Sequence, residues 1–227
     1  MAPFGIVSHP AEADAEEEHI GPWPAFVDLF AATTLIMLVF FAVIGFLYIR
    51  EKSIGVRTQQ LKKALQGVAD RQKTFSVQQV GADVLIILEE RVTFPLSQSS
   101  PLKPEGQRAL RAIGDTLKAG LLDSIAGIEI VGHADPSPYA AGSGLTNWGI
   151  SASRAATVAK FLVDSVRLDG CLLIPSGRGE YYPRDTARAA RARTPNESDR
   201  RIELLLHPVV TGAPSRGRRP GCRPIRA

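Results

Sequence analysis

The stretch Val84-Leu-Ile-Ile-Leu-Glu-Glu90 is a short apolar run with the length and composition of a buried β-strand. Residues 104–122 then place apolar side chains on one face of a helix, namely Leu110, Ile113, Leu117 and Leu121. Similar patterns follow in the order strand 128–131, helix 147–166, strand 172–174 and strand 201–206. Strands that alternate with helices predict an α/β fold, in which helices pack on one face of a mixed sheet.

Upstream of this domain, the apolar run of residues 25–49 carries one charged side chain, Asp28. As a helix at about 1.5 Å per residue, the run would reach roughly 37 Å, which exceeds a hydrocarbon core of about 30 Å. Pro24 suits the first turn of a helix, and Trp23 suits the headgroup layer. We therefore expect a single transmembrane helix over residues 23–50. A cleaved signal peptide is a weaker interpretation, because acidic rather than basic residues precede the run.

Asp28 is the most informative residue of this run. A carboxylate at membrane depth costs a few kcal/mol, so it normally marks an ion pathway or a buried contact with a partner. The alternative is that Asp28, one turn into the helix, reaches the interface and favours the positive end of the helix dipole. The first interpretation predicts that Asp28 takes part in ion translocation. The second predicts no functional role for this residue.

The chain has 227 residues and a formal net charge of +4, which leaves room for one domain of ordinary size after the membrane helix. Residues 1–22 form an acidic tail and residues 209–227 an arginine-rich basic tail, and both are expected to be disordered. No aromatic residue interleaves with the arginines of the basic tail, so we expect no nucleic-acid contact. The two cysteines, Cys171 and Cys222, do not decide the redox compartment.

The segment of residues 51–78 is expected to be a helical linker before a domain of residues 79–208. It carries a narrow apolar stripe, formed by Ile54, Leu61, Leu65 and Val68. A stripe of this width fits a seam between two helices better than burial against a globular core. The linker therefore predicts a homodimer.

The sequence gives little support for an enzyme. No nucleophile and base occur at motif spacing, and His9, His19, His133 and His207 have no metal-ligand spacing. Gly177 and Gly179 are interpreted as turn glycines, because no helix start with a lysine follows them. No metal and no cofactor are expected.

Several short motifs of the domain occur in one recognisable order. They are Val92-Thr-Phe94, Gly132-His-Ala-Asp135, Asn147-Trp-Gly-Ile-Ser-Ala-Ser-Arg-Ala155, Gly177-Arg-Gly-Glu180 and Asp199-Arg-Arg-Ile-Glu203. In this order they resemble the OmpA/MotB C-terminal domain. The apolar run with its aspartate, preceded by Trp23, resembles the transmembrane segment of MotB and ZorB stator subunits.

The first resemblance implies that the domain binds peptidoglycan. It implies that Asp135 and Arg154 hold the zwitterionic end of diaminopimelate, with Asn147 at the cap of the second helix as a neighbouring contact. The chemistry is reasonable, because a carboxylate accepts from an ammonium and a guanidinium pairs with a carboxylate. Two alternatives remain, an Asx-turn for Asp135 and a solvated helix position for Arg154. The chain departs from the family pattern at Ala134 and Asp199.

The second resemblance implies a motor. Two copies would pair inside a ring of a MotA/ZorA-like multi-span membrane subunit, and Asp28 would carry protons past that ring. The short connection between membrane and domain favours a ZorB-like role in anti-phage defence over a flagellar MotB. A passive OmpA-like tether between membrane and wall is a further alternative.

The location implied is the bacterial inner membrane, with a single span and the C-terminal domain in the periplasm. One observation opposes this topology. The basic residues Arg50, Lys52, Arg57, Lys62 and Lys63 follow the membrane helix, and no lysine or arginine precedes it. The positive-inside rule alone would place the domain in the cytoplasm. The wall-binding motif carries more weight, because peptidoglycan lies outside the cytoplasm.

Overall fold

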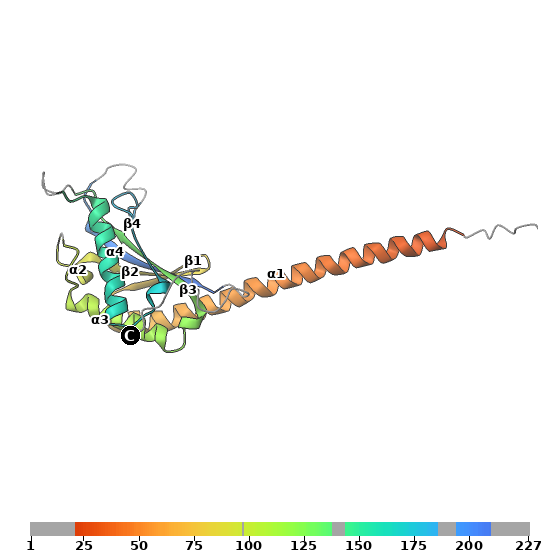
Figure 1. Cartoon of the computed structure of the whole chain (residues 1–227), viewed down its shortest axis with the longest axis horizontal. Helices are drawn as coiled ribbons and strands as arrows, with labels where there is room; N and C mark the ends of the chain where they lie inside the picture. Colours follow the sequence, from red (N-terminus) through yellow and green to blue (C-terminus); the bar gives the residue numbers. More distant parts are fainter. Residues whose placement is uncertain (1–20, 97, 138–143, 186–193, 210–227) are drawn as a thin grey trace, which may run out of the picture. The chain divides into compact units, whose positions relative to one another are not determined.

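The structure, a computed structural model, describes residues 21–96, 98–137, 144–185 and 194–209 (Figure 1). Nearly all of the acidic and basic tails lies outside these residues, as do Cys222, His9 and His19. The chain divides into two compact units, which comprise residues 1–47 and residues 48–227.

The N-terminal unit contains the first part of helix α1 (Trp23–Gln72), which begins where the sequence predicted. Among the described residues, α1 is the one helix long and apolar enough to cross a membrane, as judged by its length and composition. The Thr33 hydroxyl lies 2.9 Å from the Leu29 carbonyl oxygen and 3.0 Å from that of Phe30. This polar group is therefore satisfied within the helix, as an apolar environment requires.

The C-terminal unit is built on a sheet of five strands in the order β1-β2-β5-β3-β4. The strands are β1 (Ser76–Val80), β2 (Asp83–Glu89), β3 (Ile125–His133), β4 (Leu173–Gly177) and β5 (Arg201–Pro208). Strands β3 and β4 are parallel and the other neighbours are antiparallel, which confirms the predicted mixed sheet. The sequence did not predict β1. At the opposite edge, Pro175 of β4 is in register with Ile130 of β3.

Helices cover one face of this sheet (Figure 1). The short α2 (Glu90–Thr93) follows β2 directly, and the longer helices are α3 (Pro104–Lys118) and α4 (Asn147–Asp164). Three 3₁₀ turns complete the domain: η1 (Leu122–Ser124), η2 (Gly170–Leu172) and η3 (Glu197–Asp199). Alternate strand residues and the inner sides of the helices form one core, which includes Ile86, Leu88, Ile130, Leu204, Leu110, Ile113, Val158 and Leu162. The predicted layer arrangement is therefore confirmed.

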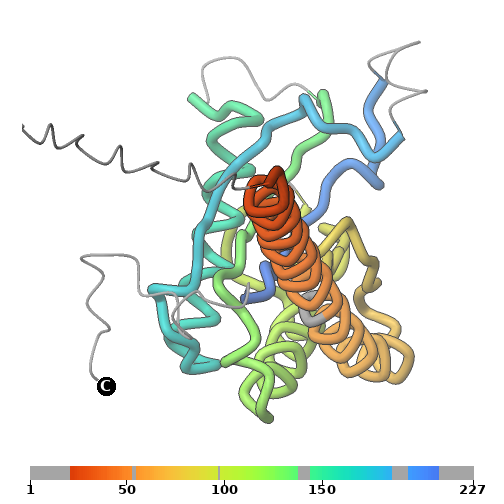
Figure 2. Tube along the Cα trace, turned by 90° about the vertical axis from the view of Figure 1, so that its right-hand side faces the viewer, coloured from red at the N-terminus to blue at the C-terminus, as the bar shows by residue number. Residues whose placement is uncertain are grey.

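Three residues of the apolar stripe of α1, Leu61, Leu65 and Val68, belong to this same core, which corrects the prediction of a two-helix seam for them. The side chain of Ile54, the fourth residue of the stripe, lies outside the described part of the chain. Leu61 and Leu65 are fully buried against the domain, and Val68 joins them. The Thr58 hydroxyl donates a 2.7 Å hydrogen bond to the Ala82 carbonyl in the turn between β1 and β2. In Figure 2 the orange end of α1 lies beside this hairpin. The stripe is narrow because only one side of α1 contacts the domain.

Helix α4 approaches the sheet at two glycines that face each other in neighbouring strands, Gly132 of β3 and Gly177 of β4. A Cβ atom added at Gly132 would lie 2.0 Å from the Ser151 carbonyl oxygen. At Gly177 it would lie 2.6 Å from the Ala152 backbone nitrogen. Only glycine permits this close contact. The contact brings the first turns of α4 to the ends of β3 and β4.

We expect Gly132→Ala to lower the free energy of unfolding by about 3 kcal/mol, because backbone atoms of α4 cannot move away as a side chain could. Chemical denaturation of the detergent-solubilised chain would measure the change. Gly127→Ala in the same strand is the control, since a Cβ added there would lie at an ordinary contact distance of 3.6 Å from the Leu172 carbonyl oxygen. Equal stability of the two variants would contradict this description of the α4 contact.

The other face of the sheet carries a polar cluster in which His133 and Arg201 are buried and Glu203 is partly buried. His133 Nε2 lies 3.1 Å from Glu203 Oε2, and Arg201 Nε donates a 2.7 Å hydrogen bond to Glu203 Oε1. Burial by itself would raise the pKa of Glu203. Hydrogen bonds and electrostatic attraction from His133 and Arg201 outweigh burial and lower this pKa from 4.5 to about 2.

A carboxyl group with a lowered pKa stabilises the fold above its unfolded-state pKa, and this contribution is lost as the pH falls through the folded-state value. We therefore expect Glu203→Gln to reduce stability at pH 7 by up to about 3 kcal/mol. The difference from wild type should shrink between pH 4.5 and pH 2, the range of this shift. Urea denaturation at several pH values would test this, and a difference independent of pH would contradict it.

Candidate functional site

Three segments of the C-terminal unit meet at the same end of the central strands of the sheet. Glu90 follows β2, Asp135 lies two residues after β3, and Arg200 precedes β5. They meet because Arg201 is in register with both Glu89 and His133. The contact of α4 with the glycines of β3 and β4 brings a fourth segment to this edge.

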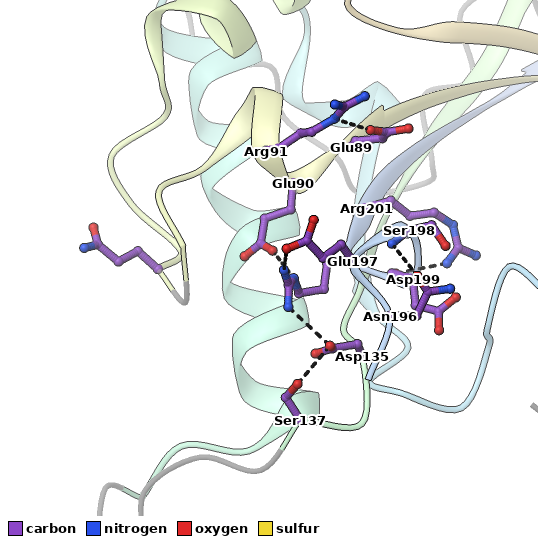
Figure 3. A network of polar contacts seen from close by, with 12 residues as sticks. Glu89, Glu90, Arg91, Asp135, Ser137, Asn196, Glu197, Ser198, Asp199 and Arg201 are labelled. Atoms are coloured by element: carbon purple, nitrogen blue, oxygen red, sulfur yellow. Dashed lines mark hydrogen bonds and ion pairs between the residues drawn. The ribbon is translucent and has the colours of Figure 1, made fainter. Parts of the chain in front are cut away.

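Four charged side chains form a continuous network at this point. Figure 3 shows two of them, Glu90 and Asp135, among the polar residues around them. Arg200 contacts Glu90 through Nε and donates a 3.2 Å hydrogen bond from Nη1 to Asp135 Oδ2. Glu90 also pairs with Arg154, whose Nε donates a 2.9 Å hydrogen bond to the Gln98 carbonyl. Positive and negative groups thus alternate in the order Arg154, Glu90, Arg200 and Asp135.

Three of the four charged side chains are almost fully buried. Arg154 is 2% exposed, while Glu90 and Asp135 are each 4% exposed. The Arg154 guanidinium also lies over the Phe94 ring, 5.7 Å from its centroid. A buried charge is costly unless it is paired, so each member of the network depends on its neighbours.

The structure brings the predicted residues Asp135 and Arg154 into one network, but it joins them through two residues that the sequence did not single out. Arg200 stands in one of the motifs, where no role was assigned to it, and it pairs with the buried Glu90 and Asp135. The solvated alternative for Arg154 is wrong, because this side chain is buried. Asp135 does have a local partner, since Ser137 Oγ donates a 2.9 Å hydrogen bond to it.

The predicted cap position of Asn147 is wrong by one residue. Thr146 is the cap of α4, and its hydroxyl accepts a 2.9 Å hydrogen bond from the Gly149 backbone. Asn147 begins the helix and donates a 2.5 Å hydrogen bond to Glu180 Oε2. Asn147 therefore ties α4 to the segment after β4, beside the ion-pair network.

A cavity of about 400 Å³ opens next to this network. Glu90 and Arg200 contribute to its wall, together with Glu89, Arg91, Phe94, Leu96, Lys103, Asn196, Glu197 and Ser198. Charged groups of both signs therefore line one hollow, which suits a ligand that itself carries both signs. In the described parts of the chain, no group of three or more histidine, cysteine or acidic residues is placed to hold a metal.

Comparison with known proteins agrees with this architecture. Residues 96–197 match the model of the OmpA family. Motility protein B of Bacillus subtilis is 27% identical over 125 residues, which are 55% of this chain and 45% of that protein. The matched stretch thus spans less than half the length of that relative.

Solved structures show the same fold. A putative MotB-like protein from Desulfovibrio vulgaris has a TM-score of 0.58 at 20% identity, and the match covers 71% of this chain and 99% of that one. The cell wall anchor of the T6SS from Pseudomonas aeruginosa has a TM-score of 0.52 at 22% identity, covering 64% and 95%. The periplasmic domain of Helicobacter pylori MotB reaches 0.51 at 16% identity, covering 62% and 83%.

The chain therefore combines one candidate membrane helix with an OmpA-like mixed α/β domain. Within that class, the domain is similar to MotB both in sequence and in fold. The resemblance inferred from the motifs is confirmed.

Proposed function

We propose that this chain is the wall-anchored subunit of an ion-driven membrane motor. In this proposal the OmpA-like domain binds peptidoglycan, and Asp28 carries protons at a contact with a MotA/ZorA-like membrane subunit. The relatives support a non-enzymatic role, since they are described as a motility protein and a cell wall anchor.

The observation that carries the wall-binding part is the buried network of Asp135, Arg200, Glu90 and Arg154 beside the 400 Å³ cavity. The end of a peptidoglycan stem bears an ammonium and a carboxylate. An ammonium can join the carboxylates of Asp135 and Glu90, and a ligand carboxylate can pair with a guanidinium. Because Glu90 already occupies both arginines, ligand binding would proceed by exchange of partners within the network.

We expect Asp135→Asn to weaken binding of the full chain to purified peptidoglycan sacculi at least about tenfold, because a charge-assisted contact is lost. Co-sedimentation over a range of sacculus concentrations would give the affinity. Asp164→Asn is a matched control, since Asp164 is exposed and pairs with Lys160 on the surface of α4. Equal binding by both variants, each shown by circular dichroism to be folded at the assay temperature, would reject the assignment of the site.

Two features of α1 support the membrane part of the proposal. Asp28 lies in the second turn of an apolar helix, where a lone carboxylate needs a protein partner or a proton. Ala31 and Ala32 follow one turn later, and small side chains allow a neighbouring helix to approach closely. A partner ring and a second copy of this chain are the proposed neighbours.

We expect Asp28→Asn to abolish proton flux when the chain is reconstituted in liposomes with its MotA-like partner, because an amide cannot take up and release a proton. Asp28→Glu keeps an acid at this position and should retain part of the flux. A pH-sensitive dye inside the liposomes would report the flux under an imposed gradient. Flux that is the same in Asp28→Asn as in wild type would leave the passive tether as the better proposal.

The proposed location is the inner membrane, with the domain in the periplasm. Among the basic residues that follow the membrane helix, Arg57 donates a 3.2 Å hydrogen bond to the Val209 carbonyl and is partly buried. This residue therefore has a structural role in the domain, which weakens its value as an orientation signal. Leu61 of α1 already belongs to the domain core, so the connection between residue 50 and the domain is short, as the ZorB-like role in defence supposes.

A further inference from the structure

Half-exposed aromatic side chains gather beside the ion-pair network. Among the described residues after α1, six large apolar side chains are exposed: Val80, Leu96, Leu145, Trp148, Tyr181 and Tyr182. Four of these six come from two short segments, residues 145–148 and 181–182. Single exposed apolar residues are ordinary, but a group of them at one place marks a binding surface.

Trp148 and Tyr181 form a surface that we call the aromatic platform. Their ring centroids are 5.6 Å apart and their planes are tilted by 30° to each other. About half of each side chain is exposed, 50% for Trp148 and 51% for Tyr181. The Trp148 ring rests on Gly179, where an added Cβ would lie 3.4 Å from ring atom Cδ2 and the φ angle is +57°.

The platform is held in place by hydrogen bonds of the segment that carries it. The Arg178 amide donates to the Gly132 carbonyl (2.9 Å), and the Gly179 amide donates to the Ser151 hydroxyl (3.0 Å). The Ala134 amide donates to the Gly179 carbonyl (2.9 Å), so the platform segment lies directly beside the residue that precedes Asp135. A surface fixed before binding loses little conformational entropy when a ligand arrives.

The chemistry of this surface suits a sugar ring. The faces of tryptophan and tyrosine rings carry a partial negative charge, and they attract the C–H groups on the face of a pyranose. The side chains of Asn147 and Glu180 lie at the border of the platform, where they can bond hydroxyl and N-acetyl groups. In peptidoglycan the stem peptide and the glycan strand are one covalent molecule, so a second contact nearby increases the overall affinity.

We propose that the aromatic platform of Trp148 and Tyr181 binds an amino-sugar ring of the peptidoglycan glycan strand, beside the site for the stem peptide. This inference rests on the proposed peptidoglycan-binding function and adds a second ligand class to it. The ion-pair network would recognise the charged peptide end, and the neutral platform would recognise the uncharged sugar face.

The test compares three ligands with the full chain in detergent. They are intact sacculi, glycan strands freed of stem peptides by an amidase, and the stem peptides released by that treatment. We expect Trp148→Ala and Tyr181→Ala each to weaken binding to glycan strands and to sacculi about three- to tenfold. Binding of the free stem peptides should stay within about twofold of wild type. Trp148→Phe should retain most of the glycan binding, because it keeps an aromatic face.

Val80→Ala is the control, since it shortens an exposed apolar side chain on the edge strand β1. Unchanged glycan binding in both alanine variants would overturn the proposal, as would an equal loss of stem-peptide binding. A change in oligomeric state without a change in glycan binding would assign the platform to contacts between copies and would also overturn it.

The wild-type chain separates this proposal from the function on which it rests. Binding to stem peptides but not to glycan strands would reject the platform and keep the peptide site. Binding to glycan strands but not to stem peptides would reject the peptide site and keep the platform. Binding to neither ligand nor to sacculi would reject both.

Discussion

Arg200 holds two buried carboxylates together at the edge of the sheet, and the arrangement of the site depends on this contact. Its guanidinium contacts Glu90 after β2 and Asp135 after β3, while Arg154 reaches Glu90 from α4. Burying any one of these charges without its partner would cost several kcal/mol. The same ion pairs that assemble the site therefore also join the ends of two strands to a helix.

Much of the fold was predictable because alternation and helical spacing report burial directly. Ile86 and Leu204 alternate into the core as their strands require, and α3 and α4 were found from their apolar faces. Strand β1 was missed because it is a polar edge strand in which only Val77 is buried. The stripe of α1 was assigned to a helical partner because periodicity shows that one face is apolar. It does not show which surface covers that face.

The site was predictable only in part. Asp135 and Arg154 stand in recognisable motifs, whereas Glu90 ends an apolar strand and resembles a solvated terminal residue. Its role follows from the register of β2 with β5, which sets Glu89 opposite Arg201 and so brings Glu90 close to Arg200. Long-range register of this kind is not visible in local sequence. An acidic residue immediately after a buried strand, with paired arginines opening a later one, was the available signal.

Strand β4 is an edge strand of the sheet, and Pro175 is its central residue. Proline has no amide hydrogen, so this edge strand cannot offer an unbroken row of backbone N–H donors to another chain. Edge-to-edge growth of the sheet is thereby discouraged on this side. Two copies confined side by side in a membrane would meet at high local concentration, where unguarded margins promote aggregation. A proline at this place therefore limits pairing between the sheets of neighbouring domains.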